Sequence, residues 1–401
     1  MNRIDGRLQW MKDELDLLKR QSQQRLLTPA VILAEGWVVR GGRRMLNLAS
    51  NNYLGLFQPL DAALLEEFIQ QAAVFDSEVK LGSTASRLIN GNDPIYGQFE
   101  QKFAEYKGTG SCLVFSNGYM ANTGIISSLV GRNDLVFSDR LNHASIVDGI
   151  TLSRAENIRY RHRDMNHLET LLSKADPLKK KLIVTDTIFS MDGSIAPLQS
   201  IVELKNKYGA LLMVDEAHSG GVYGEQGQGL AHSVGLMQEI DVHMGTFSKA
   251  YGCYGAYAAG DSLVIEYLIN KARSFIYTTS LPPVVIQAVW HNWTKVREGH
   301  WRRRVLQERV VLLREGLKRS GFNVGESESQ IVPLIIGDND RTVLFSDYLQ
   351  QHGVAAVAVR PPTVPEGEAR VRFTLMATHR VEDLAWALDL IERAGKKFAI
   401  I

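Results

Sequence analysis

The chain has 401 residues, of which 45% are hydrophobic and 22% charged, and its formal net charge at pH 7 is +1. This balance is typical of a globular protein, and the length exceeds that of one ordinary core, so we expect a large domain and a smaller one. A net charge near zero gives no reason to expect a nucleic-acid or membrane-surface partner.

The cysteines and the N-terminus indicate the cellular compartment in which the protein is expected. Cys112 and Cys253 are far apart and lack metal-site spacing, so we expect neither a disulfide framework nor a bound metal. The N-terminus is charged and has no apolar signal-peptide core, and no run of about 18 apolar residues occurs. These features predict a cytoplasmic protein without a membrane span.

The predicted elements fall into three parts. Residues 1–50 begin with an amphipathic helix over 8–26, followed by short strands around an Arg-Gly-Gly-Arg turn within 36–50. Residues 51–290 contain apolar runs separated by helical or glycine-rich connections, which is typical of a mostly parallel α/β sheet covered on both faces. The predicted strands of this large domain are 112–116, 134–139, 181–186, 211–215 and 256–260.

Residues 291–401 differ in character and are predicted to form a separate small α+β domain. A long helical stretch over 284–320 leads into this part of the chain. The elements expected after it are a strand over 331–336, a helix over 341–352, a strand over 370–375 and a helix over 381–394.

The stretch "HMGTFSKAYGCYGAYAAG", residues 243–260, places Lys249 among small residues and hydroxyls. Burial lowers the pKa of a lysine, and a partly neutral amine is a nucleophile toward carbonyls. Thr246 and Ser248 can bind an anion, and the glycines allow close approach of a flat ligand. These are the requirements of a lysine that holds pyridoxal 5′-phosphate (PLP) as a Schiff base; the alternative is an exposed lysine in a turn.

Polar residues at the ends of predicted strands fit the same cofactor, because ligands of parallel sheets lie at the carboxyl ends of the strands. Asp215 in "VDEAH" could pair with the pyridine nitrogen, and His218 could reach the ring hydroxyl. No phosphate-binding G-x-x-x-x-G-K-[ST] motif precedes this string, so a helicase is excluded. The helix that opens at Asn117 in "NGYMAN" offers backbone N–H groups to a phosphate, and His143 could stack on the ring.

The order of motifs NGYMAN, NHAS, FSMDG, VDEAH, TFSKAYG and TTSLPP resembles the α-oxoamine synthases, a branch of the fold-type I PLP enzymes. The resemblance extends from residue 46 to residue 379. It implies that Lys249 carries PLP and removes the α-proton of an amino acid, that Asp215 pairs with the ring nitrogen, and that His143 stacks on the ring. The other residues that it assigns to the cofactor are His218 and Ser190 at the ring hydroxyl, and Gly118, Tyr119 and Thr246 at the phosphate.

The resemblance also implies a homodimer and a substrate site. Thr278 and Thr279 match positions that reach the phosphate of the neighbouring subunit. Asn51 and Arg372 match residues at the amino-acid carboxylate, for which a bidentate guanidinium is suited.

Within the family, residues 358–379, with Arg360, are most similar to the members that join L-alanine to a pimeloyl thioester, and Arg25 matches a residue that meets the acyl substrate. The alternatives are a glycine C-acetyltransferase or a synthase for another acyl-CoA, a catalytically silent member of the family, and an aminotransferase. Tyr96, Ala85 and Asp186 depart from residues that are common in the family.

Overall fold

The computed structural model describes residues 6–74 and 78–401. Residue contacts divide this part of the chain into two compact units. The sheet unit comprises residues 52–190 and 194–304, and the terminal unit comprises 6–51, 191–193 and 305–401. The sequence places the divisions after residues 50 and 290, whereas the contacts place them after Asn51 and Arg304.

A seven-stranded sheet with the order β4-β10-β9-β8-β7-β5-β6 forms the centre of the sheet unit. Every strand is parallel to the others except β10, which is antiparallel to both β4 and β9. The strands β5, β7, β9 and β10 are buried along their whole length, and in all of them except β9 this burial explains the apolar runs in the sequence. The strands are β4 (Ser111–Phe115), β5 (Leu135–Asp139), β6 (Glu156–Tyr160), β7 (Lys181–Asp186), β8 (Leu211–Asp215), β9 (Val242–Thr246) and β10 (Ala256–Gly260).

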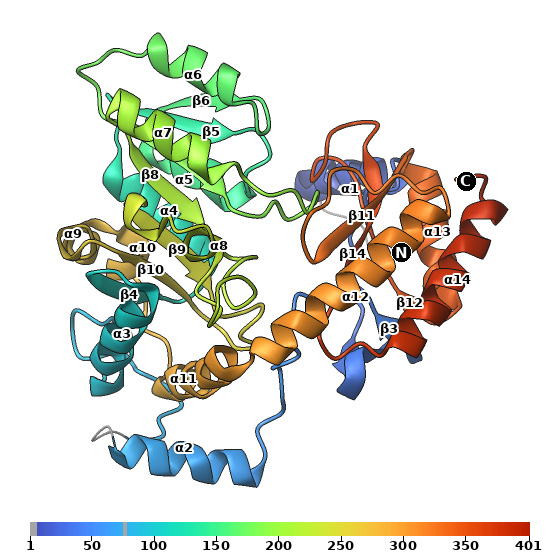
Figure 1. The fold of residues 1–401 in the computed structure, drawn as a ribbon, viewed down its shortest axis with the longest axis horizontal. Coiled ribbons are helices and arrows are strands. Elements are labelled where there is room, and N and C mark those ends of the chain that lie inside the picture. Colours follow the sequence, from blue (N-terminus) through green and yellow to red (C-terminus); the bar gives the residue numbers. More distant parts are fainter. Residues whose placement is uncertain (1–5, 75–77) are drawn as a thin grey trace. The chain divides into compact units, whose positions relative to one another are not determined.

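Helices cover both faces of this sheet (Figure 1). On one face α4, α5, α9 and α10 pack in a core with residues such as Ile126 and Met244, and on the other α6 and α7 pack with residues such as Phe137 and Val214. The mostly parallel α/β sheet predicted from the sequence is confirmed. The helices of the unit are α2 (Ala62–Val74), α3 (Pro94–Lys107), α4 (Gly118–Leu129), α5 (Ala144–Ser153), α6 (Met165–Ser173), α7 (Leu198–Tyr208), α8 (Leu230–Ser233), η3 (Met237–Glu239), α9 (Ser262–Lys271), α10 (Arg273–Ile276) and α11 (Pro283–Glu298).

The terminal unit combines both ends of the chain around two small sheets, with strand orders β1-β2-β3-β12 and β11-β14-β13. The strand β12 joins the N-terminal strands because Val354 pairs with Leu46 in a parallel register. The elements are η1 (Gly6–Leu8), α1 (Gln9–Arg20), β1 (Ala30–Ile32), η2 (Ala34–Gly36), β2 (Trp37–Arg40), β3 (Arg43–Asn47), β11 (Ile331–Gly337), α13 (Asn339–Gln351), β12 (Val354–Ala355), β13 (Val357–Val359), β14 (Ala369–Thr374) and α14 (Val381–Lys397).

Two helix predictions need correction. The stretch 284–320 is two helices, α11 and α12 (His300–Arg319), which are separated at Gly299, and glycine is a poor helix former. The N-terminal helix α1 ends at Arg20 rather than near residue 26. None of the helices in the described parts of the chain is both long and apolar enough to cross a membrane.

Candidate active site

The parallel strands of the sheet unit bring polar residues to one edge of the sheet. Asp186 ends β7 and pairs in register with Asp215 at the end of β8, and Asp215 pairs with Met244 near the end of β9. Thr246 ends β9. The carboxyl edge of a parallel sheet is where ligands bind in folds of this kind, so these residues form the floor of a candidate site.

Asp215 is a buried carboxylate with fixed hydrogen bonds. Its Oδ2 accepts from the Asn122 side-chain amide of α4 at 2.8 Å, and its Oδ1 accepts from the Ala217 backbone N–H at 2.8 Å. The Asn122 amide nitrogen also lies 2.9 Å from Ser145 Oγ, while its own carbonyl oxygen has no hydrogen-bond partner among the described residues. A buried carboxylate that is oriented in this way suits an N–H donor such as a protonated pyridine nitrogen.

Asp186 lies beside Asp215 and shares its buried environment. Burial, together with the charge of Asp215, raises the pKa of Asp186 well above its ordinary value. Its Oδ2 accepts from the backbone N–H of His143 at 2.8 Å. Asp186, which departs from the family pattern, therefore holds the backbone of His143 through a hydrogen bond.

His143 caps the N-terminus of α5. Its Nδ1 accepts from the Ser145 N–H at 3.2 Å and lies 2.7 Å from the Ser145 hydroxyl, which leaves the ring proton on Nε2. Burial lowers the pKa of His143, Asp215 opposes that shift, and Lys249 reinforces it. A neutral imidazole that is fixed by its cap suits stacking on a flat ring.

Lys249 belongs to a chain of three polar groups. Its Nζ lies 2.8 Å from His218 Nε2, and His218 Nδ1 lies 2.6 Å from the hydroxyl of Tyr53. His218 is 4% exposed and Tyr53 is completely buried. Sequence reasoning missed Tyr53, Asn122 and Ser145, although Tyr53 stands in the motif "SNNYLG"; a tyrosine hydroxyl that is buried usually has a partner, which is the signal that could have found it.

The start of α4 is the candidate site for the phosphate. Gly118 and Tyr119 are its first two residues, and such N–H groups have no partner within a helix. A Cβ on Gly118 would lie 3.9 Å from the Cβ of Thr246, so the two are neighbours. Thr246 Oγ1 lies 2.5 Å from Ser248 Oγ. The side chain of Tyr119 donates instead to Asp148 at 2.6 Å, so only its backbone N–H is available to the anion.

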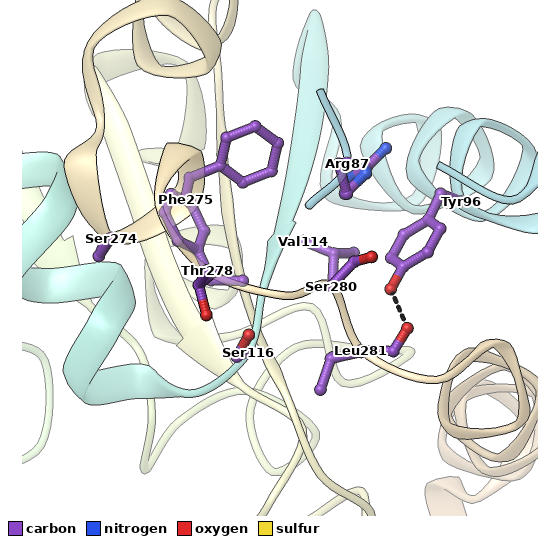
Figure 2. Close-up of a pocket in the computed structure, with 10 residues that line it drawn as sticks. Arg87, Tyr96, Val114, Ser116, Ser274, Phe275, Thr278, Ser280 and Leu281 are labelled. Atoms are coloured by element: carbon purple, nitrogen blue, oxygen red, sulfur yellow. Dashed lines mark hydrogen bonds between the residues drawn. The ribbon is translucent and has the colours of Figure 1, made fainter. Parts of the chain in front are cut away.

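The three remaining residues of this unit that are predicted to contact the cofactor lie in loops. Ser190 follows β7 in a short turn. Thr278 and Thr279 follow α10, and Thr278 lines a small pocket with Ser116. In Figure 2 the hydroxyl of Tyr96 points to the carbonyl oxygen of Leu281, to which it donates at 2.6 Å. Tyr96, where a histidine is common in the family, thus holds the segment that carries the two threonines.

The four predicted substrate residues belong to the terminal unit. Arg372 on β14 donates through Nη2 to Asn51 Oδ1 at 3.0 Å, so the two residues are brought together as the resemblance implies. Arg25 also acts electrostatically on Arg360. Burial lowers the pKa of the half-buried Arg360, the positive charge of Arg25 lowers it further, and Asp347 opposes both.

Among residues 6–74 and 78–401, no cluster of His, Cys, Asp or Glu side chains is arranged to hold a metal ion. The donors that do converge fit PLP. They are a buried carboxylate, a capped imidazole, a lysine amine and the N–H groups at the start of a helix.

Comparison with known proteins defines the class. The aminotransferase class I and II profile matches residues 43–391. A Halalkalibacterium halodurans protein provisionally named 8-amino-7-oxononanoate synthase is 52% identical over 383 residues, covering 96% of this chain and 95% of its own. A Bacillus cereus protein with the same provisional name is 50% identical over 389 residues, covering 96% and 97%.

Solved structures agree with the sequence relatives. Serine palmitoyltransferase from Sphingomonas wittichii superposes with a TM-score of 0.89 at 31% identity over 99% of both chains. The 8-amino-7-oxononanoate synthase of Francisella tularensis gives a TM-score of 0.73 at 28% identity, over 89% of this chain and 99% of its own. The fold is that of the fold-type I PLP transferases, and the protein is a PLP-dependent acyltransferase. The chain belongs to the aminotransferase class I and II family and, within it, to the α-oxoamine synthases.

Proposed function

We propose that the protein joins L-alanine to a pimeloyl thioester to give 8-amino-7-oxononanoate. In this reaction a bond forms between the alanine Cα and the acyl carbon, the thioester C–S bond breaks, and the α-carboxylate leaves as CO2. The observation that carries the proposal is the pair Arg25 and Arg360, which interact within the terminal unit. A pimeloyl chain ends in a carboxylate, and two guanidinium groups are suited to bind it. The provisional names of the relatives support the same substrate.

Residues of the sheet unit would hold the cofactor. Asp215, oriented by Asn122, would bind the ring nitrogen, and His143 would lie against the ring. His218 and Ser190 would contact the ring hydroxyl. When bound, PLP would supply an electron sink for the reaction at the amino-acid Cα. The Lys249 amine would hold the cofactor until an amino acid displaces it, and would then be free to take the α-proton of that amino acid as a general base.

Other residues bind the two anionic ends of the ligands. The N–H groups of Gly118 and Tyr119, with the Thr246 hydroxyl, hold the phosphate. Arg372, whose guanidinium is oriented by Asn51, binds the α-carboxylate of alanine until it leaves.

The active unit that we propose is a cytoplasmic homodimer. Thr278 is partly exposed and Thr279 is exposed on the sheet unit, which leaves them accessible to the phosphate of a neighbouring subunit. Cys112 and Cys253 are both free thiols, which accords with a reducing compartment.

The decisive experiment compares acyl donors of equal length. Purified protein loaded with PLP is given L-alanine with pimeloyl-CoA or with heptanoyl-CoA, which lacks the distal carboxylate. We expect the protein to prefer pimeloyl-CoA. In Arg360→Gln and Arg25→Gln, kcat/KM for pimeloyl-CoA should fall by about 10- to 100-fold, as expected for loss of a charged hydrogen bond, with little change for heptanoyl-CoA.

The matched control is Arg341→Gln, because the Arg341 guanidinium donates to the carbonyl oxygens of Phe398 and Ala399 and is not one of the residues proposed to bind a substrate. Condensation of glycine with acetyl-CoA, or of an amino acid with a long-chain acyl-CoA, in place of the pimeloyl reaction would assign the protein to another activity of the family.

A further inference from the structure

A hydrogen-bonded chain of Asp139, His162 and Ser194 lies outside the residues assigned above. His162 Nδ1 is 3.0 Å from Asp139 Oδ1, and His162 Nε2 is 2.9 Å from Ser194 Oγ. Because a carboxylate only accepts, Nδ1 donates to Asp139, and in the neutral ring Nε2 then accepts the proton of Ser194. Asp139 is itself fixed, since it also accepts from the backbone N–H groups of Leu141 and Arg163.

The order Asp–His–Ser is that of a serine hydrolase, but Ser194 cannot act as a nucleophile here. Ser194 is 1% exposed and Asp139 is 2% exposed, so a substrate carbonyl has no access to the hydroxyl. The hydrogen-bonded group of Asp139, His162 and Ser194 therefore has a different role. The position of Ser194 in the turn after β7 indicates what that role is.

Ser194 closes a short hairpin that presents Ser190. The Phe189 N–H donates to the Ser194 carbonyl oxygen at 3.0 Å, and Ile188 and Ile195 form the next bridge. The ring of His162 packs edge-on against Phe189, with 4.4 Å between ring centroids. His162 thus contacts both residues of the hydrogen-bonded pair Phe189–Ser194. Its ring packs against Phe189, and its Nε2 accepts from the Ser194 hydroxyl.

The other side of the same turn is also anchored. Residues 191–193 belong to the terminal unit, in which Arg370 Nη1 donates to Asp192 Oδ1 at 2.6 Å and the Gly193 carbonyl oxygen accepts from the Glu328 N–H at 3.0 Å. Within the sheet unit, Ser190 directly follows Phe189, so the contacts of Phe189 with His162 and Ser194 restrict the backbone on that side of Ser190.

We propose that His162 is a positioning residue for Ser190, acting through Ser194 and Phe189, and that it thereby sets the contact of Ser190 with the ring hydroxyl of the cofactor. This inference rests on the role proposed above for Ser190. It predicts that His162 affects the cofactor only through Ser190.

The test is a double-mutant cycle with two readouts. His162→Phe keeps a ring against Phe189 but removes both hydrogen bonds. In the protein without cofactor, we expect amide exchange of residues 189–195 to accelerate about 10-fold, as for loss of one hydrogen bond. With PLP bound, the pH midpoint of the visible absorbance should shift in His162→Phe and in Ser190→Ala. Because the two residues act in series, the double variant should shift no further than Ser190→Ala alone. We expect kcat of His162→Phe to fall about 10-fold, which is less than the roughly 100-fold loss that a misplacement of about 1 Å can cause.

Each outcome is informative, and the control is His379→Gln, a buried histidine of the terminal unit that should lower stability without shifting the absorbance midpoint. If Ser190→Ala shifts the midpoint and His162→Phe does not, or if the shifts add, the inference is wrong and the role of Ser190 stands. If Ser190→Ala shifts nothing, the proposed role of Ser190 fails and the inference fails with it. If His162→Phe does not fold, Ser194→Ala breaks the same chain at its other end and is subject to the same cycle.

Discussion

Lys249 Nζ lies 2.8 Å from His218 Nε2 within the sheet unit. The opposite ring nitrogen of His218 lies 2.6 Å from the hydroxyl of the buried Tyr53. The amine that we propose to hold the cofactor is therefore hydrogen-bonded to a histidine whose other ring nitrogen is held by Tyr53. This pair provides the most direct tests of the site.

Replacing Lys249 with alanine removes the nitrogen that we propose as both the attachment point of the cofactor and the general base. We expect the visible absorbance band of the loaded protein to disappear and kcat to fall by about 10³-fold, within the range for loss of a general base. The measurement is an absorbance spectrum together with a product assay. Lys271→Ala, at the exposed end of α9, is the control and should keep both signals. A band that survives in Lys249→Ala would exclude this lysine as the attachment point.

Replacing Tyr53 with phenylalanine removes the hydroxyl that contacts His218 and leaves a buried ring nitrogen without that partner. We expect the free energy of unfolding to fall by about 1–3 kcal/mol, the cost of an unsatisfied buried group. The pH midpoint of the cofactor absorbance should also shift, because His218 gains freedom. Tyr208→Phe serves as the control, since within residues 6–74 and 78–401 its hydroxyl has a single hydrogen bond, a long one of 3.5 Å to Glu169. A loss of stability without any change in the midpoint would limit Tyr53 to a structural role.

The sequence predicts the sheet well where strands are continuous apolar runs and poorly where they are not. The strand β8 has the predicted bounds, whereas β6 and β9 were not predicted. The strand β6 is mostly exposed at the sheet edge, and β9 carries the buried but polar His243 beside Gly245, so neither shows an uninterrupted apolar run. The long predicted helix is divided because Gly299 interrupts an otherwise helical pattern.

In the candidate site, too, residues that stand in local motifs are predictable from the sequence, whereas contacts between residues far apart in the sequence are not. Motifs place Lys249 and Asp215 because the chemistry requires a lysine and a carboxylate near strand ends. The partners Tyr53 and Asn122 lie 165 and 93 residues away from the groups they contact, and no local pattern encodes such contacts. The proximity of Arg25 to Arg360 likewise comes only from the folded terminal unit.

A buried ion pair includes Glu216, which lies in the chain between Asp215 and His218. Lys107 Nζ lies 2.5 Å from Glu216 Oε2, which also lies 3.3 Å from His243 Nδ1, and all three side chains are buried. Removing the cation in Lys107→Met leaves Glu216 buried without its partner, so we expect a loss of about 3–5 kcal/mol in the free energy of unfolding. Chemical denaturation measures this loss, and the double variant with Glu216→Gln should recover part of it. No recovery would show that Lys107 acts by packing alone.

The ion pair of Lys107 and Glu216 also predicts how the free energy of unfolding changes at low pH. Burial acts to raise the pKa of Glu216, but Lys107 and His243 outweigh it and hold the pKa below its ordinary value of 4.5. A lowered carboxylate pKa contributes stability above about pH 4.5 that is lost as the pH falls toward the folded-state pKa. Glu216→Gln should therefore lose stability at pH 7 and show a flatter decline below pH 4.5. An unchanged acid slope would contradict this assignment.

His379 should make stability depend on pH in a higher range. It is 1% exposed, its Nδ1 accepts from the Met376 N–H at 3.1 Å, and its Nε2 donates to the Asn47 carbonyl oxygen at 3.2 Å. Burial lowers the pKa of His379 from 6.5 to about 4. Because the folded state excludes the proton that the unfolded chain binds, stability is full above pH 6.5 and declines as the pH falls toward 4, by about 3 kcal/mol in all. Denaturant midpoints between pH 7 and pH 4 measure the decline, and His379→Gln, although less stable at pH 7, should lack this component. An equal slope in both proteins would assign the pH dependence to other groups.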